Sequence, residues 1–153
     1  MKNKIKYKRI ATIDIGSNAI RMLISNVYEI NGKKVSTKNN IVRIPVRLGK
    51  DSFEKSTLSD SSTNKLIKSF KAFKLLMDIN EVDSFLAYAT SAIRNINDSE
   101  VLLKRIFDET GIKLEVISGE KEAQITSQQD ISDHIGKTKN YCFVDVGGGS
   151  TEV

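Results

Sequence analysis

Residues 10–27 read IATIDIGSNAIRMLISNV. The run from Ile10 to Ile15 is apolar and β-branched, and it is interrupted by Gly16-Ser17-Asn18 before a second apolar run begins at Ile20. Two such runs joined by a Gly-Ser-Asn turn are typical of an antiparallel β-hairpin. Asn31-Gly32 is a second hairpin signal, and further strand-like runs follow at 35–37 and 41–46. The chain is therefore predicted to open as a meander of three antiparallel strands.

After the meander the hydrophobic period changes, and helices alternate with strands. Leu66, Phe70, Phe73 and Met77 recur at helical spacing, which predicts an amphipathic helix over 61–78. The elements predicted beyond it are a strand at 84–89, a helix from 97 to 111, a strand at 113–117 and a helix at 120–129. This β-β-β-α-β-α-β-α order, with right-handed crossovers between parallel strands, predicts an α/β domain of the ribonuclease-H-like class.

Composition excludes several functional classes. The 153 residues are 39% hydrophobic and 28% charged, with one proline, one cysteine and one histidine. A single cysteine excludes an internal disulfide, and with one histidine it excludes the usual zinc clusters. No apolar run is long enough for a membrane span, and no secretory signal is visible. A reduced, cytoplasmic location is expected.

The net charge of +5 is concentrated at the N-terminus. Five of the 24 basic residues lie within residues 2–9, and the 19 that remain equal the 19 acidic residues in number. A nucleic-acid-binding domain more often spreads basic side chains over one folded face among aromatic residues. We therefore expect a basic tail that leads into the first strand, and no specific nucleic-acid or membrane partner.

The last part of the chain is expected to belong to a second domain. The stretch 131–140 is polar and is interpreted as a linker after a first domain at 1–130. Residues 141–146 form a strand-like run, and Gly147-Gly148-Gly149 follows it. The turn after this run is expected to lack its return strand. We therefore expect 141–153 to be the start of a second, similar domain, so that the chain is a fragment and is nearly inactive by itself.

Two short segments resemble each other across the chain. Asp14-Ile15-Gly16-Ser17-Asn18 and Asp145-Val146-Gly147-Gly148-Gly149 each place an aspartate at a strand end, followed by a glycine-rich turn. Glycine lets successive backbone N–H groups converge on an anion. An aspartate at such a position can hold a hard cation that neutralises phosphate oxygens. The pair of turns predicts a duplicated phosphate clamp.

Two further segments begin where a predicted strand meets a helix, at the usual ligand edge of an α/β sheet. They are Thr90-Ser91-Ala92-Ile93-Arg94 and Ser118-Gly119-Glu120-Lys121-Glu122-Ala123. Arg94 is interpreted either as a bidentate phosphate ligand or as a partner in a surface salt bridge. Glu122 either complements the positive end of a helix dipole or acts as a general base that activates water.

Together these segments resemble a known family. TIDIGSNAIR (12–21), ATSAIR (89–94), ISGEKEA (117–123) and VDVGGGSTE (144–152) are similar to four signatures of the exopolyphosphatase/guanosine pentaphosphate phosphatase (Ppx/GppA) family, and Arg47-Leu48-Gly49 also fits its first half. The family belongs to the actin, sugar-kinase and chaperone ATPase superfamily, in which two ribonuclease-H-like domains close on phosphate. The resemblance spans nearly the whole chain and preserves the order of the motifs.

The resemblance implies a role for each matching residue. Glu122 and Glu152 match catalytic acids, and Asp14 and Asp145 match the positions that organise Mg²⁺ and water. The matching phosphate-binding residues are Gly16, Ser17, Asn18, Ser91, Arg94, Gly147, Gly148, Gly149, Ser150 and Thr151. One departure is Lys121, which stands where the family usually has a second acid. Ala123 fixes the register, so Glu122 is preferred over Glu120.

The function that follows is Mg²⁺-dependent hydrolysis of a terminal phosphoanhydride with release of orthophosphate. Inorganic polyphosphate is the first expected substrate, and guanosine pentaphosphate (pppGpp) is the alternative. Two rival interpretations are a phosphate- or nucleotide-binding regulatory module without turnover and an ATP-dependent kinase of the same superfamily. The context of Glu122 and the STE sequence ending at Glu152 disfavour the kinase. A homodimer of the full-length protein is left open.

Overall fold

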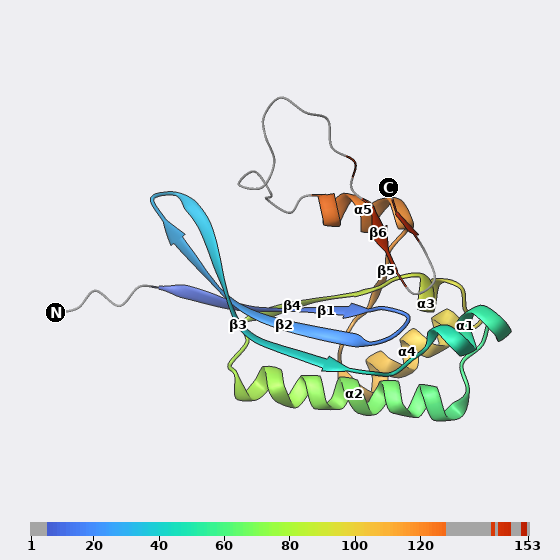
Figure 1. Cartoon of the computed structure of the whole chain (residues 1–153). Helices are drawn as coiled ribbons and strands as arrows, with labels where there is room; N and C mark the ends of the chain where they lie inside the picture. The colour runs from blue at the N-terminus through green and yellow to red at the C-terminus, as the bar shows by residue number, and fades with distance from the viewer. Residues whose placement is uncertain (1–5, 128–141, 143, 148–150, 153) are drawn as a thin grey trace.

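The centre of the molecule is a five-stranded mixed sheet (Figure 1). The computed structural model describes residues 6–127, 142, 144–147 and 151–152. The sheet has the strand order β3-β2-β1-β4-β5; β1 pairs antiparallel with β2, and β4 runs parallel to both β1 and β5. Its strands are β1 (Tyr7–Ile15), β2 (Ile20–Ile30), β3 (Lys33–Ile44), β4 (Ser84–Ala89) and β5 (Glu115–Val116). The predicted meander and the predicted α/β class are confirmed.

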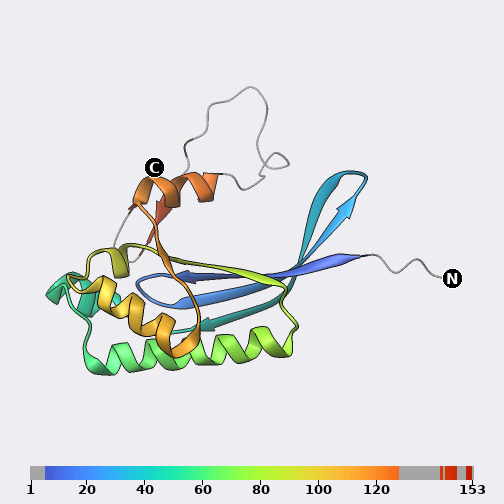
Figure 2. The same ribbon diagram turned by 180° about the vertical axis from the view of Figure 1, so that it is seen from behind.

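Helices α2 and α4 lie against the same face of the sheet in both views (Figures 1 and 2). Alternate residues of β1, namely Ala11, Ile13 and Ile15, are buried beneath them. From α2, Leu66, Phe70 and Phe73 are fully buried, as their helical spacing predicts. The helices are α1 (Gly49–Lys55), α2 (Asp60–Ile79), α3 (Ser91–Arg94), α4 (Ser99–Thr110) and α5 (Gly119–Ser127).

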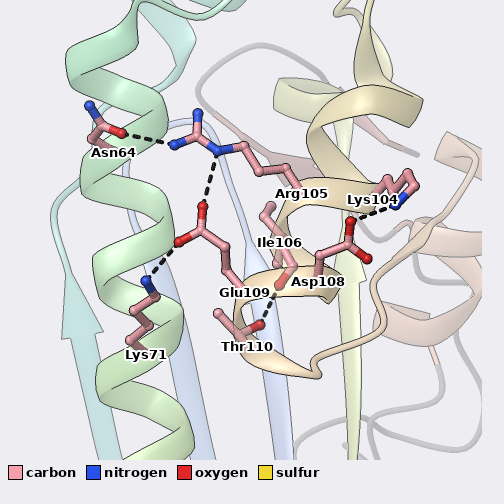
Figure 3. Close-up of polar contacts among 8 residues, drawn as sticks. All are labelled: Asn64, Lys71, Lys104, Arg105, Ile106, Asp108, Glu109 and Thr110. Atoms are coloured by element: carbon pink, nitrogen blue, oxygen red, sulfur yellow. Dashed lines mark hydrogen bonds and ion pairs between the residues drawn. The ribbon is translucent and has the colours of Figure 1, made fainter.

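Charged side chains join the outer surfaces of α2 and α4 (Figure 3). The Glu109 carboxylate accepts from Lys71 Nζ at 2.7 Å and from Arg105 Nε at 3.0 Å, and Arg105 also donates to Asn64 at 3.3 Å. Lys71, and then Arg105, lower the pKa of Glu109 below its usual range. Because these groups are exposed, the network contributes little to stability. Its single carboxylate offsets one of the two positive charges.

The structure differs from the sequence-based expectation at several points. The pieces expected at 35–37 and 41–46 form one strand, β3, with an extra residue, Asn39, opposite the Ile24–Ser25 step. The short helices α1 and α3 were not predicted. The expectation that the turn after Val146 lacks a return strand is wrong, because β6 (Asp145–Val146) pairs antiparallel with β7 (Thr151–Glu152). Residues 131–140, the predicted linker, lie outside the described residues.

The tip of the β2–β3 hairpin projects well beyond the helical layer (Figure 1). We call residues 25–38 the arm. Asn31 (φ 52°) and Gly32 (φ 74°) both have positive φ, which is the type I′ geometry that matches the twist of paired strands. Both views show the arm bending away from the side of the sheet that carries α2. No helix in the described part of the chain is long and apolar enough to cross a membrane.

A cluster around Asp51 connects α1 to the start of α2. The Asp51 Oδ2 atom accepts hydrogen bonds from the hydroxyls of Ser59 and Ser62, both at 2.7 Å, and from the Ser59 backbone N–H at 3.2 Å. Ser59 is the N-cap of α2, and its side chain accepts from the Ser62 N–H. These bonds, with that from the Ser59 hydroxyl first, lower the pKa of Asp51 from 3.8 to about 2.

We expect Asp51→Asn to lower the free energy of unfolding at pH 7 by about 1 kcal/mol, because it weakens charge-assisted hydrogen bonds at a helix cap. The folded-state pKa of Asp51 is depressed, so its contribution is present above pH 3.8 and is lost as the pH falls through about 2. Urea unfolding across this range should show the two proteins converging at the acid end. Glu54→Gln on the same helix is the control, and an equal effect of both variants would contradict the prediction.

Candidate functional site

The turn between β1 and β2 is the first predicted phosphate loop, and it is held by the segment after β3. The Gly16 N–H donates to the Ala19 carbonyl at 3.1 Å, which closes the turn. The Asn18 carbonyl accepts from Arg47 N at 2.9 Å, and the Ser17 carbonyl accepts from Gly49 N at 2.9 Å. Ser17 is buried by this contact, with 6% exposure. The backbone of the turn is therefore fixed before any ligand binds, although the Gly16 N–H is already used.

Residue 49 must be small for this support to form. A Cβ atom at Gly49 would lie 3.2 Å from Ser17 Cβ and 3.3 Å from the Phe53 ring, both closer than ordinary contacts. The Arg47-Leu48-Gly49 segment therefore has a packing reason for its glycine, which the sequence pattern alone did not reveal. Leu48 is fully buried and anchors the segment in the core.

The turn at residues 90–94 lies beside the end of β1. Ile15 and Ala89 are register partners in the parallel pair β1–β4, so both strands end at one edge of the sheet. The Thr90 hydroxyl donates to the Ile15 carbonyl at 3.0 Å, and the Thr90 N–H donates to the same oxygen at 3.3 Å. Ser91, the predicted phosphate ligand, follows and is buried. Sequence reasoning did not single out Thr90; its signal is a hydroxyl residue at a strand end.

Arg94 and Glu122 meet at the same edge, from two different helices. Arg94 Nη1 donates to the Ile117 carbonyl at 2.6 Å and lies 4.0 Å from Glu122 Oε2. Their side chains are 31% and 21% exposed. Both interpretations of Arg94 stay open: the salt bridge is present, and only Nη1 of a guanidinium with five N–H donors takes part in these two contacts.

The first turn of α5 presents Glu122 rather than its acidic neighbour. Ser118 caps the helix, because its Oγ accepts from Lys121 N at 3.2 Å and its carbonyl accepts from Glu122 N at 3.0 Å. Glu120 and Lys121 are exposed, whereas Glu122 is half-buried and lies against Arg94. This geometry supports the choice of Glu122 over Glu120, and it places the unusual Lys121 toward solvent.

Of the two carboxylates predicted to hold a metal ion, Asp14 and Asp145, the structure describes the side chain of Asp14 alone. Asp14 is 49% exposed on the sheet face opposite α2, and its Oδ2 lies 3.9 Å from Arg21 Nε. The described residues contain no group of three or more His, Cys, Asp or Glu side chains that could hold a metal ion. Mg²⁺ commonly uses only one or two carboxylates, with water and substrate phosphate completing its shell. An exposed carboxylate beside a phosphate loop fits that pattern.

The second motif is described in part. Asp145 and Val146 pair with Glu152 and Thr151, and β7 contacts α5, the helix that carries Glu122. Gly148, Gly149 and Ser150 lie outside the described residues, as do the side chains of Asp145 and Glu152. The structure thus brings together the first loop, Ser91, Arg94 and Glu122 at one sheet edge, with the second motif beside α5.

The sequence comparisons identify the family. The model of the Ppx/GppA phosphatase family matches residues 27–153. The chain belongs to the Ppx/GppA phosphatase family. Among curated relatives, a bifunctional 3-dehydroquinate synthase/phosphatase of Fusobacterium nucleatum is 35% identical over 96% of this chain and 23% of its own length. Exopolyphosphatase 1 of Mycobacterium tuberculosis is 27% identical over 95% of this chain and 41% of its own length. The chain thus spans well under half of each of these two relatives.

Solved structures agree with this family assignment. The Ppx/GppA protein of Aquifex aeolicus superposes with a TM-score of 0.75 at 32% identity, covering 95% of this chain and 47% of that one. An exopolyphosphatase from Cytophaga hutchinsonii superposes with a TM-score of 0.70 at 30% identity, covering 77% of this chain and 36% of that one. The fold predicted from the strand and helix order is therefore the fold of this family.

We expect Gly49→Ala to lower the free energy of unfolding by about 1 kcal/mol, because the added methyl overpacks a tight contact with Ser17. The cost should fall when Ser17→Gly removes the opposing Cβ, and chemical denaturation of the four proteins of this double-mutant cycle measures the difference. Additive effects of the two substitutions would show that the contact does not constrain the loop.

Proposed function

We propose that the protein hydrolyses the terminal phosphoanhydride of inorganic polyphosphate and releases orthophosphate. The observation that carries the proposal is the Glu122 carboxylate 4.0 Å from Arg94 Nη1, at the sheet edge that also bears the glycine-containing turn at residues 16–18. A base, a cation and a backbone loop at one edge are the groups that phosphoryl transfer to water requires. The family match and the exopolyphosphatase relatives support the same reaction class.

In the proposed reaction Glu122 orients a water molecule and accepts its proton. The water oxygen forms a bond to the terminal phosphorus, and the bond from that phosphorus to the bridging oxygen breaks. The shortened chain leaves with the electron pair of the broken bond. Arg94 has donors beyond Nη1 that can neutralise charge on the phosphoryl oxygens. No covalent enzyme intermediate is needed, because positioning and charge stabilisation carry most of the catalysis.

The residues present fit a requirement for Mg²⁺. Asp14 offers an exposed carboxylate at the end of β1, and Asp145 occupies the equivalent position in the second motif. These two residues would hold the ion, which when bound supplies positive charge for the phosphate oxygens. The turn at 16–18 would then bind the phosphate beside it, with Ser17 and Asn18 as the remaining donors.

Glu122→Gln should reduce the rate of phosphate release from polyphosphate by about 100-fold or more and leave KM largely unchanged, since it removes a general base. Gln keeps the size of the side chain, so folding should be preserved. The rate of phosphate release is measured with the full-length protein, with polyphosphate, pppGpp and ATP each tested as a separate substrate. Glu120→Gln, two residues earlier on the same helix, is the matched control. If Glu120→Gln reduced the rate more than Glu122→Gln did, Glu120 would be the general base instead.

Asp14→Asn and Asp145→Asn should each raise the Mg²⁺ concentration that gives half-maximal activity, because an amide binds a hard cation more weakly than a carboxylate does. The measurement is a Mg²⁺ titration of phosphate release at saturating polyphosphate. Asp108→Asn, on the outer surface of α4, is the control. An unchanged titration with normal activity in both variants would refute the assignment.

A further inference from the structure

One face of the sheet is open to solvent over β1, β2 and β3. Burial alternates along β1, so Ile13 faces the helices while Thr12 and Asp14 face the opposite side. The register places Leu23 and Ile41 on this opposite side with Thr12. Ile41 is 60% exposed, so within the described residues this side has no cover at β3.

Basic side chains line this open face from the site toward the tip of the arm. On β3 they are Arg43, paired in register with Arg21, and then Lys38 and Lys34, paired with Ser25 and Glu29. Lys8 of β1 lies opposite Val27, on the same face. We call Lys8, Lys34, Lys38 and Arg43 the basic face; all four are exposed.

The basic face differs from the helical surface in how its charges are compensated. On the helices, Lys71, Lys74, Lys104 and Arg105 each form an ion pair with an acid, and Lys71 and Arg105 share Glu109. Figure 3 shows the pairs of Lys71, Lys104 and Arg105. Among the described residues, Lys68 of α2 has no such pair. For the four side chains of the basic face, the described part of the chain supplies no ion pair or side-chain hydrogen bond. Their positive charge is therefore available for a ligand, with Glu29 as the only acid on this face of the arm.

We propose that the basic face binds an extended polyanion, namely the part of a long inorganic polyphosphate chain that lies beyond the reacting end. The inference rests on the proposed function, because it takes its ligand from there. From Arg43 to Lys34 the strand covers about 30 Å at the usual rise per residue. Arg21, the register partner of both Asp14 and Arg43, joins the first loop to this surface. The chain would thus leave the site along β3 and reach the arm.

A simpler role for these lysines is to protect an edge strand from pairing with another chain, since β3 lies at the edge of the sheet. Edge protection requires positive charge but no affinity for a polyanion. It also predicts no dependence on the length of the ligand. The two roles therefore separate in a binding experiment.

The test compares K8Q/K34Q/K38Q with K68Q/K74Q/K104Q, which removes the same charge from exposed positions on the helices. Binding of long-chain polyphosphate and of tripolyphosphate is measured by calorimetry at low and at physiological ionic strength, and circular dichroism checks folding. K8Q/K34Q/K38Q should bind the long chain about tenfold more weakly than the helix variant at low salt, with a smaller difference at high salt. Tripolyphosphate, which is too short to reach from the site to the arm, should bind both variants equally.

If the two variants bound long-chain polyphosphate with equal affinity, the proposal would be overturned. The proposal would also be overturned if single-stranded RNA bound the basic face as tightly as polyphosphate of similar charge does. The surface would then recognise negative charge alone. Failure of the proposed hydrolysis is seen separately, as absence of phosphate release with the long-chain binding difference intact. Normal phosphate release without a difference in long-chain binding between the two variants would overturn only the proposal about the basic face.

Discussion

The contact of Thr90 with the Ile15 carbonyl determines where the candidate site can form. Both the hydroxyl and the N–H of Thr90 donate to this oxygen, which would otherwise be an unpaired acceptor at the end of a central strand. The contact aligns the ends of β1 and β4, and Ile117 N bonds to the Ala89 carbonyl to align β5 with them. Three separate segments therefore begin at one edge, and Arg94 and Glu122 are brought to 4.0 Å only as a consequence.

Much of the fold was predictable because it depends on local patterns. The stripe of Leu66, Phe70 and Phe73 identifies α2 without tertiary information, and Gly111 at φ 70° ends α4 as its residue type suggests. The short helices α1 and α3 have too few turns to show a period, so they could not be inferred. The return strand β7 was missed because two residues, Thr151 and Glu152, carry no alternation.

The grouping of several candidate residues at one sheet edge was predictable from the sequence, but the contacts that support them were not; their roles stay predictions. Motif spacing pointed to Glu122 over Glu120, and the half-buried position of Glu122 agrees with that choice. By contrast, the need for glycine at residue 49 arises from a contact with Ser17, far away in the sequence. Such a requirement depends on how the loop after β3 packs on the β1–β2 turn. A single sequence has no local signal for it.

The distribution of charge also depends on the fold rather than on composition. Outside the N-terminal tail, basic and acidic residues are equal in number, which suggests an electrically balanced surface. Folding redistributes them: Glu109 on α4 pairs with Lys71 of α2, while on the arm Lys38 lies opposite the neutral Ser25, and Glu29, opposite Lys34, is the one acid on that face. A surface with more basic than acidic side chains can therefore arise although the chain beyond its N-terminal stretch is balanced. Its position, continuous with the edge that carries Asp14, is what relates it to the chemistry of an anionic substrate.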